Sequence, residues 1–250
     1  MNTNTTSKNP IIEIHDLHKS FGNNVVLNGF DLVLNEGENL VVMGKSGSGK
    51  SVMIKCIIGL EQPDSGSILV MNQEINSLER EDLDELRTEI GFLFQGSALY
   101  DSMSVRENLE FPLRRHTKKF GVIKDTTPLV MEVLESVGLA HAIDLMPNEL
   151  SGGMKRRIAL ARTLILKPKI ILYDEPTTGL DPITSKEIVL LMNSVQEKYN
   201  TSSIIITHDV DCAKVIANRM ILLIDGINYI EGTFEALASS QDPKVQAFFK

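Results

Sequence analysis

Short apolar runs separated by turns occupy the first third of the chain. The length of these runs and the polar residues that flank them predict β-strands. The predicted strands cover residues 11–14, 25–27, 30–34, 40–43 and 67–71.

The hydrophobic pattern changes in the middle of the chain, between residues 91 and 166. Apolar residues recur there three and four positions apart, which is the period of one face of an α-helix. The predicted helices cover residues 104–113, 128–137 and 151–166. The middle of the chain is therefore expected to be a helical block.

Strands and helices alternate again after this block. The pattern predicts strands at 170–173, 203–207 and 220–224, with helices at 183–199 and 210–218 between them. Alternation of this kind is typical of an α/β fold with a largely parallel sheet. The helical block is then a subdomain inserted into an α/β core.

We therefore expect one domain over residues 11–240. Its core covers 11–90 and 166–240, and its helical subdomain covers 91–165. Residues 1–10 are polar and are expected to form a disordered tail, and residues 241–250 form a C-terminal tail.

Composition narrows the class of protein. Hydrophobic residues make up 42% of the 250 residues and charged residues 23%, which is ordinary for a soluble globular protein. Apolar runs are far shorter than the roughly 20 residues that cross a bilayer, and the polar start has no export signal, so we expect a cytoplasmic location. The net charge of −8 argues against nucleic acid as a partner. The two cysteines have no metal-ligand spacing.

The predicted strand 40–43 runs directly into the sequence GKSGSGKS at residues 44–51, and a predicted helix follows over 51–60. Glycines let the backbone turn its N–H groups towards phosphate oxygens, and the helix offers its positive N-terminus to the same anion. Lys50 is expected to reach the β- and γ-phosphates, and the Ser51 hydroxyl to bind Mg²⁺. This motif alone predicts only that a nucleotide is bound, because kinases, GTPases and many ATPases share it.

A second motif narrows the class further. Ser151, Gly152 and Gly153 open a basic helix shortly before the apolar run that ends in Asp174 and Glu175. The two motifs together resemble ATP-binding-cassette (ABC) ATPases, and the resemblance extends from residue 11 to 232 with the motifs in the order of the family. It implies ATP and Mg²⁺ as ligands. It also implies a P-loop NTPase core of the RecA-like type, with an amino-terminal antiparallel β region and the inserted helical subdomain.

The resemblance assigns roles to four polar residues outside the phosphate loop. Asp174 ends an apolar strand, where a carboxylate is unfavourable unless it has a partner. Binding of Mg²⁺ would provide that partner. Glu175 matches the base that polarises the attacking water, and His208 matches the histidine that contacts the γ-phosphate. Gln95 matches the glutamine that meets Mg²⁺ and senses the partner subunit. Glu175, His208, Lys50 and Gln95 are thus the predicted catalytic residues.

Two further residues are expected to contact the adenine. Phe21 matches the aromatic residue of the family that stacks on the base, and Val26 is expected to add an apolar wall. The predicted metal ligands are Ser51, Gln95 and Asp174. The full predicted set of nucleotide-binding residues is Phe21, Val26, Gly44, Lys45, Ser46, Gly47, Ser48, Gly49, Lys50, Ser51, Gln95, Ser151, Gly152, Gly153, Asp174 and Asp181.

The second motif implies two chains. A helix that opens with Ser-Gly-Gly is another anion-binding N-terminus, although the chain already has a complete phosphate loop. In the family this motif meets the γ-phosphate of the ATP held by the opposite subunit, and the loop containing Asp181 crosses the interface. A homodimer with an isologous contact is expected. Met154 departs from the glutamine that most of the family has, so one possible hydrogen bond across the interface is missing.

Segments around the helical block resemble one group within the family. Residues 91–105, 107–113, 150–157 and 242–249 are similar to the ATPases of Mla-type (maintenance of lipid asymmetry) systems. The resemblance implies phospholipid transport between the two membranes of a diderm bacterium. It also implies integral membrane permease subunits and an MCE-domain lipid-binding protein as partners, and a position on the cytoplasmic face of the inner membrane.

Two alternatives share every catalytic motif. One is the ATPase of an amino-acid or lipoprotein ABC transporter. The other is a non-transport ABC ATPase that signals through a membrane partner in cell division. A soluble ABC protein of DNA repair or translation is not expected, because it would need a coiled-coil insert or a second cassette.

Overall fold

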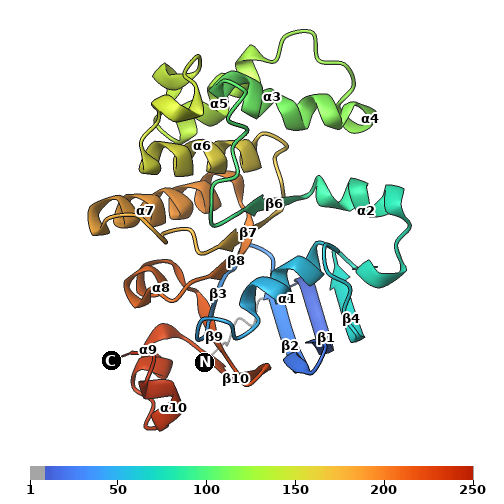
Figure 1. The fold of residues 1–250 in the computed structure, drawn as a ribbon, viewed down its shortest axis with the longest axis vertical. Helices are drawn as coiled ribbons and strands as arrows, with labels where there is room; N and C mark the ends of the chain where they lie inside the picture. Colours follow the sequence, from blue (N-terminus) through green and yellow to red (C-terminus); the bar gives the residue numbers. More distant parts are fainter. Residues whose placement is uncertain (1–8, 250) are drawn as a thin grey trace, which may run out of the picture.

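The computed structural model describes residues 9–249 of the chain (Figure 1). Its strands are β1 (Pro10–Phe21), β2 (Asn24–Asn35), β3 (Asn39–Met43), β4 (Ser65–Val70), β5 (Gln73–Glu74), β6 (Ile90–Leu93), β7 (Ile170–Asp174), β8 (Ser202–Ile206), β9 (Arg219–Ile224) and β10 (Ile227–Gly232). Its α-helices are α1 (Lys50–Ile57), α2 (Arg80–Arg87), α3 (Val105–Arg115), α4 (Thr117–Phe120), α5 (Thr127–Ser136), α6 (Gly152–Leu164), α7 (Pro182–Tyr199), α8 (Val210–Ile216), α9 (Phe234–Ala238) and α10 (Pro243–Gln246). Short 3-10 helices are η1 (Ile75–Ser77), η2 (Ala140–Ala142) and η3 (Pro147–Glu149).

The strands form two sheets. A six-stranded sheet has the order β10-β9-β3-β8-β7-β6, in which all neighbours pair in parallel except β10 and β9. A four-stranded antiparallel sheet has the order β2-β1-β4-β5. The predicted fold class is confirmed: an α/β P-loop NTPase core carries an antiparallel β region and a helical block.

The parallel sheet separates two hydrophobic cores. Side chains alternate across the faces of a strand, and β3 shows this directly. Val41 and Met43 pack with the helices α5 to α8, whereas Leu40 and Val42 pack with α1 and the antiparallel sheet. Because both faces are covered, β3 is buried at every position and has no polar face.

Helices α3 to α6 form the helical block, which lies at one end of the molecule in Figure 1. Helix α3 begins at a capping box, in which Ser104 Oγ accepts from Glu107 N–H and the Glu107 carboxylate accepts from Ser104 N–H. The apolar faces of α3, α5 and α6 pack on one another and on β7 through the first core.

The hydrophobic pattern does not predict three of the strands, which are β5, with only two residues, β6 and β10. Strand β6 was placed at the start of the helical subdomain, but residues 90–93 pair in parallel with β7 and belong to the core sheet. The run is only four residues long and lies between two helices, so its periodicity is too short to mark a strand. The helical block therefore starts after Leu93. Strand β10 is an edge strand without a buried position, which weakens its pattern.

Parts of both predicted tails are ordered. Residues 1–8 lie outside the described part, and Pro10 already begins β1. In the expected C-terminal tail, residues 243–246 form α10, and Val245 is fully buried. Within residues 9–249, none of the helices combines the length and the apolar character needed to cross a bilayer.

A buried ion pair ties the two sheets together. Glu38 is 5% exposed, and its carboxylate accepts from Arg219 Nε at 2.9 Å. Arg219 also donates to Val33 O on β2 and to Glu231 on β10. Burial opposes ionisation of Glu38, but the hydrogen bonds from Arg219 and Asn35 outweigh it and lower the pKa of the carboxyl group.

Arg219→Met should destabilise the fold by about 3 kcal/mol, because it leaves the Glu38 carboxylate buried without its cation. The matched control is Glu231→Gln, which breaks a solvent-exposed pair of the same arginine and should cost less than about 1 kcal/mol. Urea unfolding followed by circular dichroism measures both values. Equal losses in the two variants would contradict the importance of the buried pair.

Candidate nucleotide site

The phosphate loop joins the carboxyl end of β3 to the first turn of α1. Two of its glycines, Gly44 and Gly49, lie where a side chain would collide with other atoms. A Cβ on Gly44 would lie 2.7 Å from Leu223 O, and a Cβ on Gly49 would lie 2.9 Å from Val26 O. Gly49 also has a φ of +101°, which residues with a Cβ rarely adopt. The loop can therefore keep this path only with glycine at these positions.

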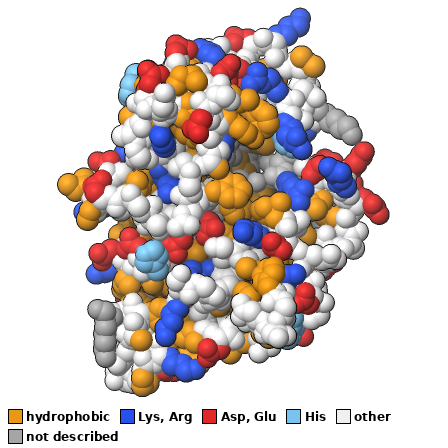
Figure 2. Space-filling view, viewed as in Figure 1, with side chains coloured by type: hydrophobic (Ala, Val, Ile, Leu, Met, Phe, Trp, Pro, Cys, Tyr) orange, Lys and Arg blue, Asp and Glu red, His pale blue; other side chains and the backbone are white. Residues whose placement is uncertain are grey.

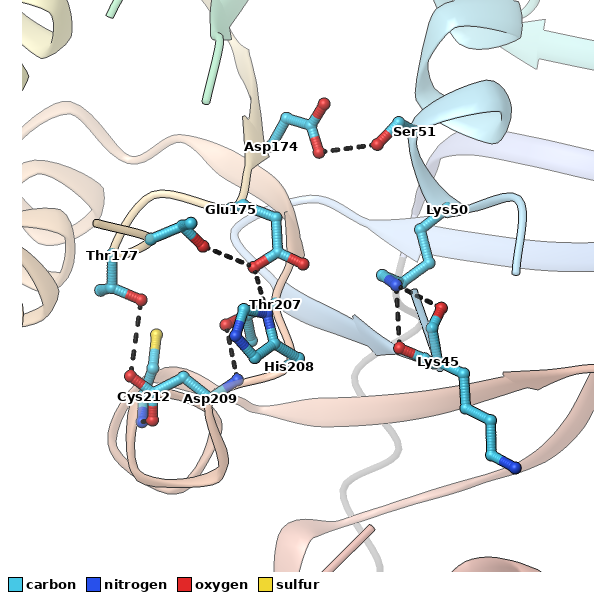
Figure 3. Close-up of polar contacts among 12 residues, drawn as sticks. Lys45, Lys50, Ser51, Asp174, Glu175, Thr177, Thr207, His208, Asp209 and Cys212 are labelled. Atoms are coloured by element: carbon cyan, nitrogen blue, oxygen red, sulfur yellow. Dashed lines mark hydrogen bonds and ion pairs between the residues drawn. The ribbon is translucent and has the colours of Figure 1, made fainter. Parts of the chain in front are cut away.

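Lys50 folds back over the loop that precedes it. Its Nζ donates to Gly44 O at 2.8 Å and to Lys45 O at 3.0 Å, and the residue is 7% exposed (Figure 3). Burial lowers the pKa of Lys50, and the nearby carboxylates of Glu175 and Asp174 oppose this shift. The ammonium group is thus positioned inside the loop, next to two acids.

Ser51 and Asp174 form a pair of oxygen groups beneath the loop. Ser51 Oγ donates to Asp174 Oδ1 at 3.0 Å, and Asp174 is 9% exposed at the end of β7 (Figure 3). Burial raises the pKa of Asp174; the hydrogen bond from Ser51 lowers it, and the neighbouring charge of Glu175 raises it further. A buried carboxylate of this kind would gain from a nearby cation.

Glu175 directly follows β7, and its side chain contacts the loop that follows β8. His208 Nδ1 lies 2.8 Å from Glu175 Oε2, and Thr178 Oγ1 donates to the same oxygen at 3.1 Å (Figure 3). A carboxylate only accepts hydrogen bonds, so the imidazole proton belongs on Nδ1. Glu175 has a φ of +51°, a left-handed conformation that costs a residue with a side chain about 1 kcal/mol or more. The fold holds this carboxylate against backbone strain.

Lys50, Ser51, Glu175 and His208 line a cavity of about 670 Å³, whereas Asp174 does not line it. Residues predicted from the sequence make up most of its lining: Phe21, Val26, Gly44, Lys45, Ser46, Gly47, Ser48, Gly49, Lys50, Ser51, Gln95, Glu175 and His208. Val52, Ala247 and Phe248 line it as well. The loop, Gln95, Glu175 and His208 therefore share one site with Phe21 and Val26.

The second motif lies elsewhere in the chain. Ser151 caps α6 by accepting from Met154 N–H at 3.2 Å, and a Cβ on Gly153 would lie 2.7 Å from a methyl group of Thr184 on α7. Asp181 caps α7 and accepts from the N–H groups of Ile183 and Thr184. The Ser-Gly-Gly turn and Asp181 thus lie beside the start of α7, and neither lines the cavity of their own chain.

Two features of the site escaped the sequence analysis. Arg156 on α6 is 4% exposed and donates to Phe94 O at 2.8 Å, next to Gln95, and to Thr178 O at 3.4 Å. It links the second-motif helix to both the Gln95 loop and the Glu175 loop. Phe248 lines the cavity from the other end of the chain. Neither has a local signal, because both act through contacts distant in sequence.

The residues of the cavity fit a nucleoside triphosphate. Ser48 Oγ is buried and has no hydrogen-bond partner among the described residues, so it is available to a phosphate. The N-terminus of α1 faces the same space, and Phe21 is 47% exposed beside it. Ser51 and Asp174 together offer two oxygen ligands, which suits Mg²⁺ because this ion takes its other ligands from water and phosphate.

A phosphate-binding glycine loop follows one strand of the parallel sheet, and two acids lie at the end of a neighbouring strand. This combination defines a P-loop nucleoside triphosphatase. The sequence profile described as "ABC transporter" matches residues 27–178. The chain belongs to the ABC transporter family, as its ATP-binding subunit.

Curated relatives agree with this assignment. The intermembrane phospholipid transport system ATP-binding protein MlaF of Haemophilus influenzae is 40% identical over 241 residues, which are 96% of this chain and 90% of that protein. The probable ribonucleotide transport ATP-binding protein mkl of Mycobacterium leprae is 40% identical over 238 residues, 95% of this chain and 68% of that protein. The methionine import ATP-binding protein MetN of Brucella abortus is 37% identical over 243 residues, 96% of this chain and 65% of that protein. This chain therefore spans about two thirds of the last two proteins.

Solved structures share the fold over most of the chain. The dimeric ATP-binding cassette MJ0796, in a post-hydrolysis state bound to ADP and Pi, has a TM-score of 0.80 and 32% identity, covering 89% of this chain and 98% of that one. The cbiO1 protein of Clostridium perfringens, part of the cbiONQ ABC transporter complex, has a TM-score of 0.85 and 27% identity, covering 97% of this chain and 96% of that one. The chain is thus an ATPase that couples ATP hydrolysis to transport.

Gly49→Ala should destabilise the protein by about 3 kcal/mol and abolish ATP binding, because the new methyl group collides with Val26 O and the backbone has to move. Gly47→Ala is the matched control. Gly47 also has a positive φ, but a Cβ there meets no atom within 4 Å, so a cost of only about 1 kcal/mol is expected. Urea unfolding and ATP titration measure the stability and the ATP affinity of both variants. Similar losses in the two would show that the close approach of Gly49 to Val26 O is not important.

Proposed function

We propose that this ATPase moves phospholipids between the inner and outer membranes of a diderm bacterium, as part of an Mla-like ABC transporter. The observation that carries the proposal is the similarity to the Haemophilus MlaF protein, which extends over 90% of that protein. The segments 91–105 and 107–113, which run from β6 through most of α3, also resemble Mla-type ATPases. These segments belong to the part of a cassette that faces a permease.

In the proposed reaction, Glu175 is the base that polarises the attacking water, and His208 holds the carboxylate in place. The 2.8 Å contact between them and the strained backbone of Glu175 support these roles. Lys50 compensates phosphate charge. Ser51, Asp174 and Gln95 would hold Mg²⁺, which would supply charge neutralisation at the phosphates.

Glu175→Gln should bind ATP with nearly unchanged affinity but hydrolyse it about 100-fold more slowly or worse, because the amide cannot take a proton from water. ATP should then trap a closed dimer, which gel filtration with light scattering detects. Near-normal turnover of the variant would remove Glu175 from its proposed role. The control is Glu187→Gln, which neutralises an exposed acid of α7 that pairs with Arg157 outside the cavity.

The active form is proposed to be a homodimer in which Ser151, Gly152 and Gly153 meet the ATP of the opposite chain. None of the three lines the cavity of its own chain, which supports this arrangement because the helix N-terminus then has no anion of its own chain to bind. Asp181 begins α7 beside this turn and would lie at the same interface. Hydrolysis removes contacts that bridge the chains and so permits the dimer to open.

A permease is proposed to dock beside the loop that carries Gln95. Phe94 and Tyr100 are 39% and 43% exposed on this loop, and their rings contact Phe92 and Phe111. Hydrophobic side chains gather around a hollow in the middle of one face of the molecule, between the helical block and α1 (Figure 2). Exposed apolar surface of this kind is typical of a protein contact.

The complete assembly is proposed to contain two ATPase chains, integral membrane permease subunits and an MCE-domain lipid-binding protein. The ATPase would then lie on the cytoplasmic face of the inner membrane. Import of an amino acid is the second candidate, and the similarity to the Brucella MetN protein favours it. The shorter coverage of that protein, 65% against 90%, ranks it below lipid transport.

Affinity purification of the tagged chain from native membranes, followed by mass spectrometry, distinguishes the candidates. Lipid transport predicts that a polytopic permease and an MCE-domain protein co-purify with bound phospholipid. The Glu175→Gln variant with ATP should hold the same partners more tightly. Recovery of an amino-acid permease, a lipoprotein exporter or a cell-division membrane protein would overturn the substrate and leave the ATPase assignment intact.

A further inference from the structure

The nucleotide cavity has a second apolar side that no motif predicts. Phe21 and Val26 form the first apolar side of the cavity and belong to β1 and β2. Ala247 and Phe248 line the same cavity from residues 242–249, which we call the closing segment. Two apolar sides next to a phosphate loop are typical of the part of a nucleotide site that holds the base.

The closing segment is anchored to the core at several points. Tyr229 Oη donates to Asp242 Oδ2 at 2.6 Å, and Lys244 Nζ lies 3.2 Å from Asp225 Oδ2. Val245 is fully buried in the first core. These contacts attach the segment to the hairpin of β9 and β10, so the position of Phe248 is set by the core.

Phe248 borders two neighbouring cavities along the phosphate loop. The second cavity has a volume of about 460 Å³ and also touches Val26 and residues 45–48. Phe248 is half-buried, because it also packs against the first core. The next residue, Phe249, differs: its ring packs edge-on against Phe234 with the centroids 5.5 Å apart, and it lines neither cavity.

Phe21, which lines the cavity from β1, has one partner already. Lys19 Nζ lies 5.1 Å from the centroid of the Phe21 ring, and the residue remains 47% exposed. A purine base that stacks on Phe21 needs apolar contacts at its edges or on its other face to be held firmly. Among the described residues of the cavity, Phe248 is the other aromatic side chain that can supply them.

We infer that Phe248 of the closing segment is a second binding residue for the base of ATP. This inference rests on the proposed nucleotide site and extends it to a part of the chain outside all the motifs. Because the segment is attached to β9 and β10, base binding would also tie the closing segment to the phosphate loop.

The test is calorimetric titration of the full chain with two ligands, Mg²⁺-ATP and Mg²⁺ with inorganic triphosphate. Phe248→Ala should weaken ATP binding about tenfold, in the range of aromatic stacking on a base, and leave triphosphate binding within about twofold. Phe248→Leu keeps apolar volume at the position and should fold like the parent, with an ATP loss of about threefold or more. Phe249→Ala is the matched control, because it removes a ring of the same segment outside the cavity, and its ATP affinity should stay within about twofold.

Three results would overturn the inference. They are unchanged ATP binding in both Phe248 variants, an equal loss for ATP and triphosphate, and an equal ATP loss in the Phe249→Ala control. Failure of the nucleotide site itself gives a different result, since the parent protein would then bind neither ATP nor triphosphate.

Discussion

The parallel pairing of β3, β8 and β7 is the constraint on which the site depends. In the register of these strands, Val42 and Asp174 both lie opposite Ile206. The loops that follow the three strands therefore begin at the same edge of the sheet. One loop carries the phosphate-binding glycines, one carries Glu175, and one carries His208. A shift of one residue in the register would turn these side chains to the wrong faces.

Burial on both faces makes this register stable. Strands β3, β7 and β8 are buried throughout, and each contributes alternate residues to the two cores. Such a sheet gives a rigid base for loops that have to hold charged groups close together. The strain at Glu175 and the close approach at Gly49 persist because the surrounding strands leave the backbone no other path.

Helix α6 connects the site to the surface where a permease is proposed to dock. The Ser-Gly-Gly turn lies at its N-terminus, and Arg156 one turn later binds the carbonyl groups of Phe94 and Thr178. Towards its C-terminus, Arg162 donates to the carbonyl groups of Ala98 and Ser97. A movement of α6 on opening of the dimer would therefore move the 94–98 loop as well. The helix and its three carbonyl contacts to this loop would thus link the nucleotide site to the proposed membrane partner.

The amino-acid sequence by itself determined the fold class, the phosphate loop, and the acids at the end of β7, because each depends on a local pattern. A strand, a glycine loop and a helix in succession are typical of a nucleotide-binding site, and two acids after an apolar strand stand out from their surroundings. Strand β6 was missed because four apolar residues between helices carry no clear period. Ser151 and Asp181 were recognised by motif, but only the tertiary structure placed them beside α7 and away from their own cavity. Arg156 and Phe248 were decided by the tertiary structure alone, since the contacts that position them join residues far apart in the chain.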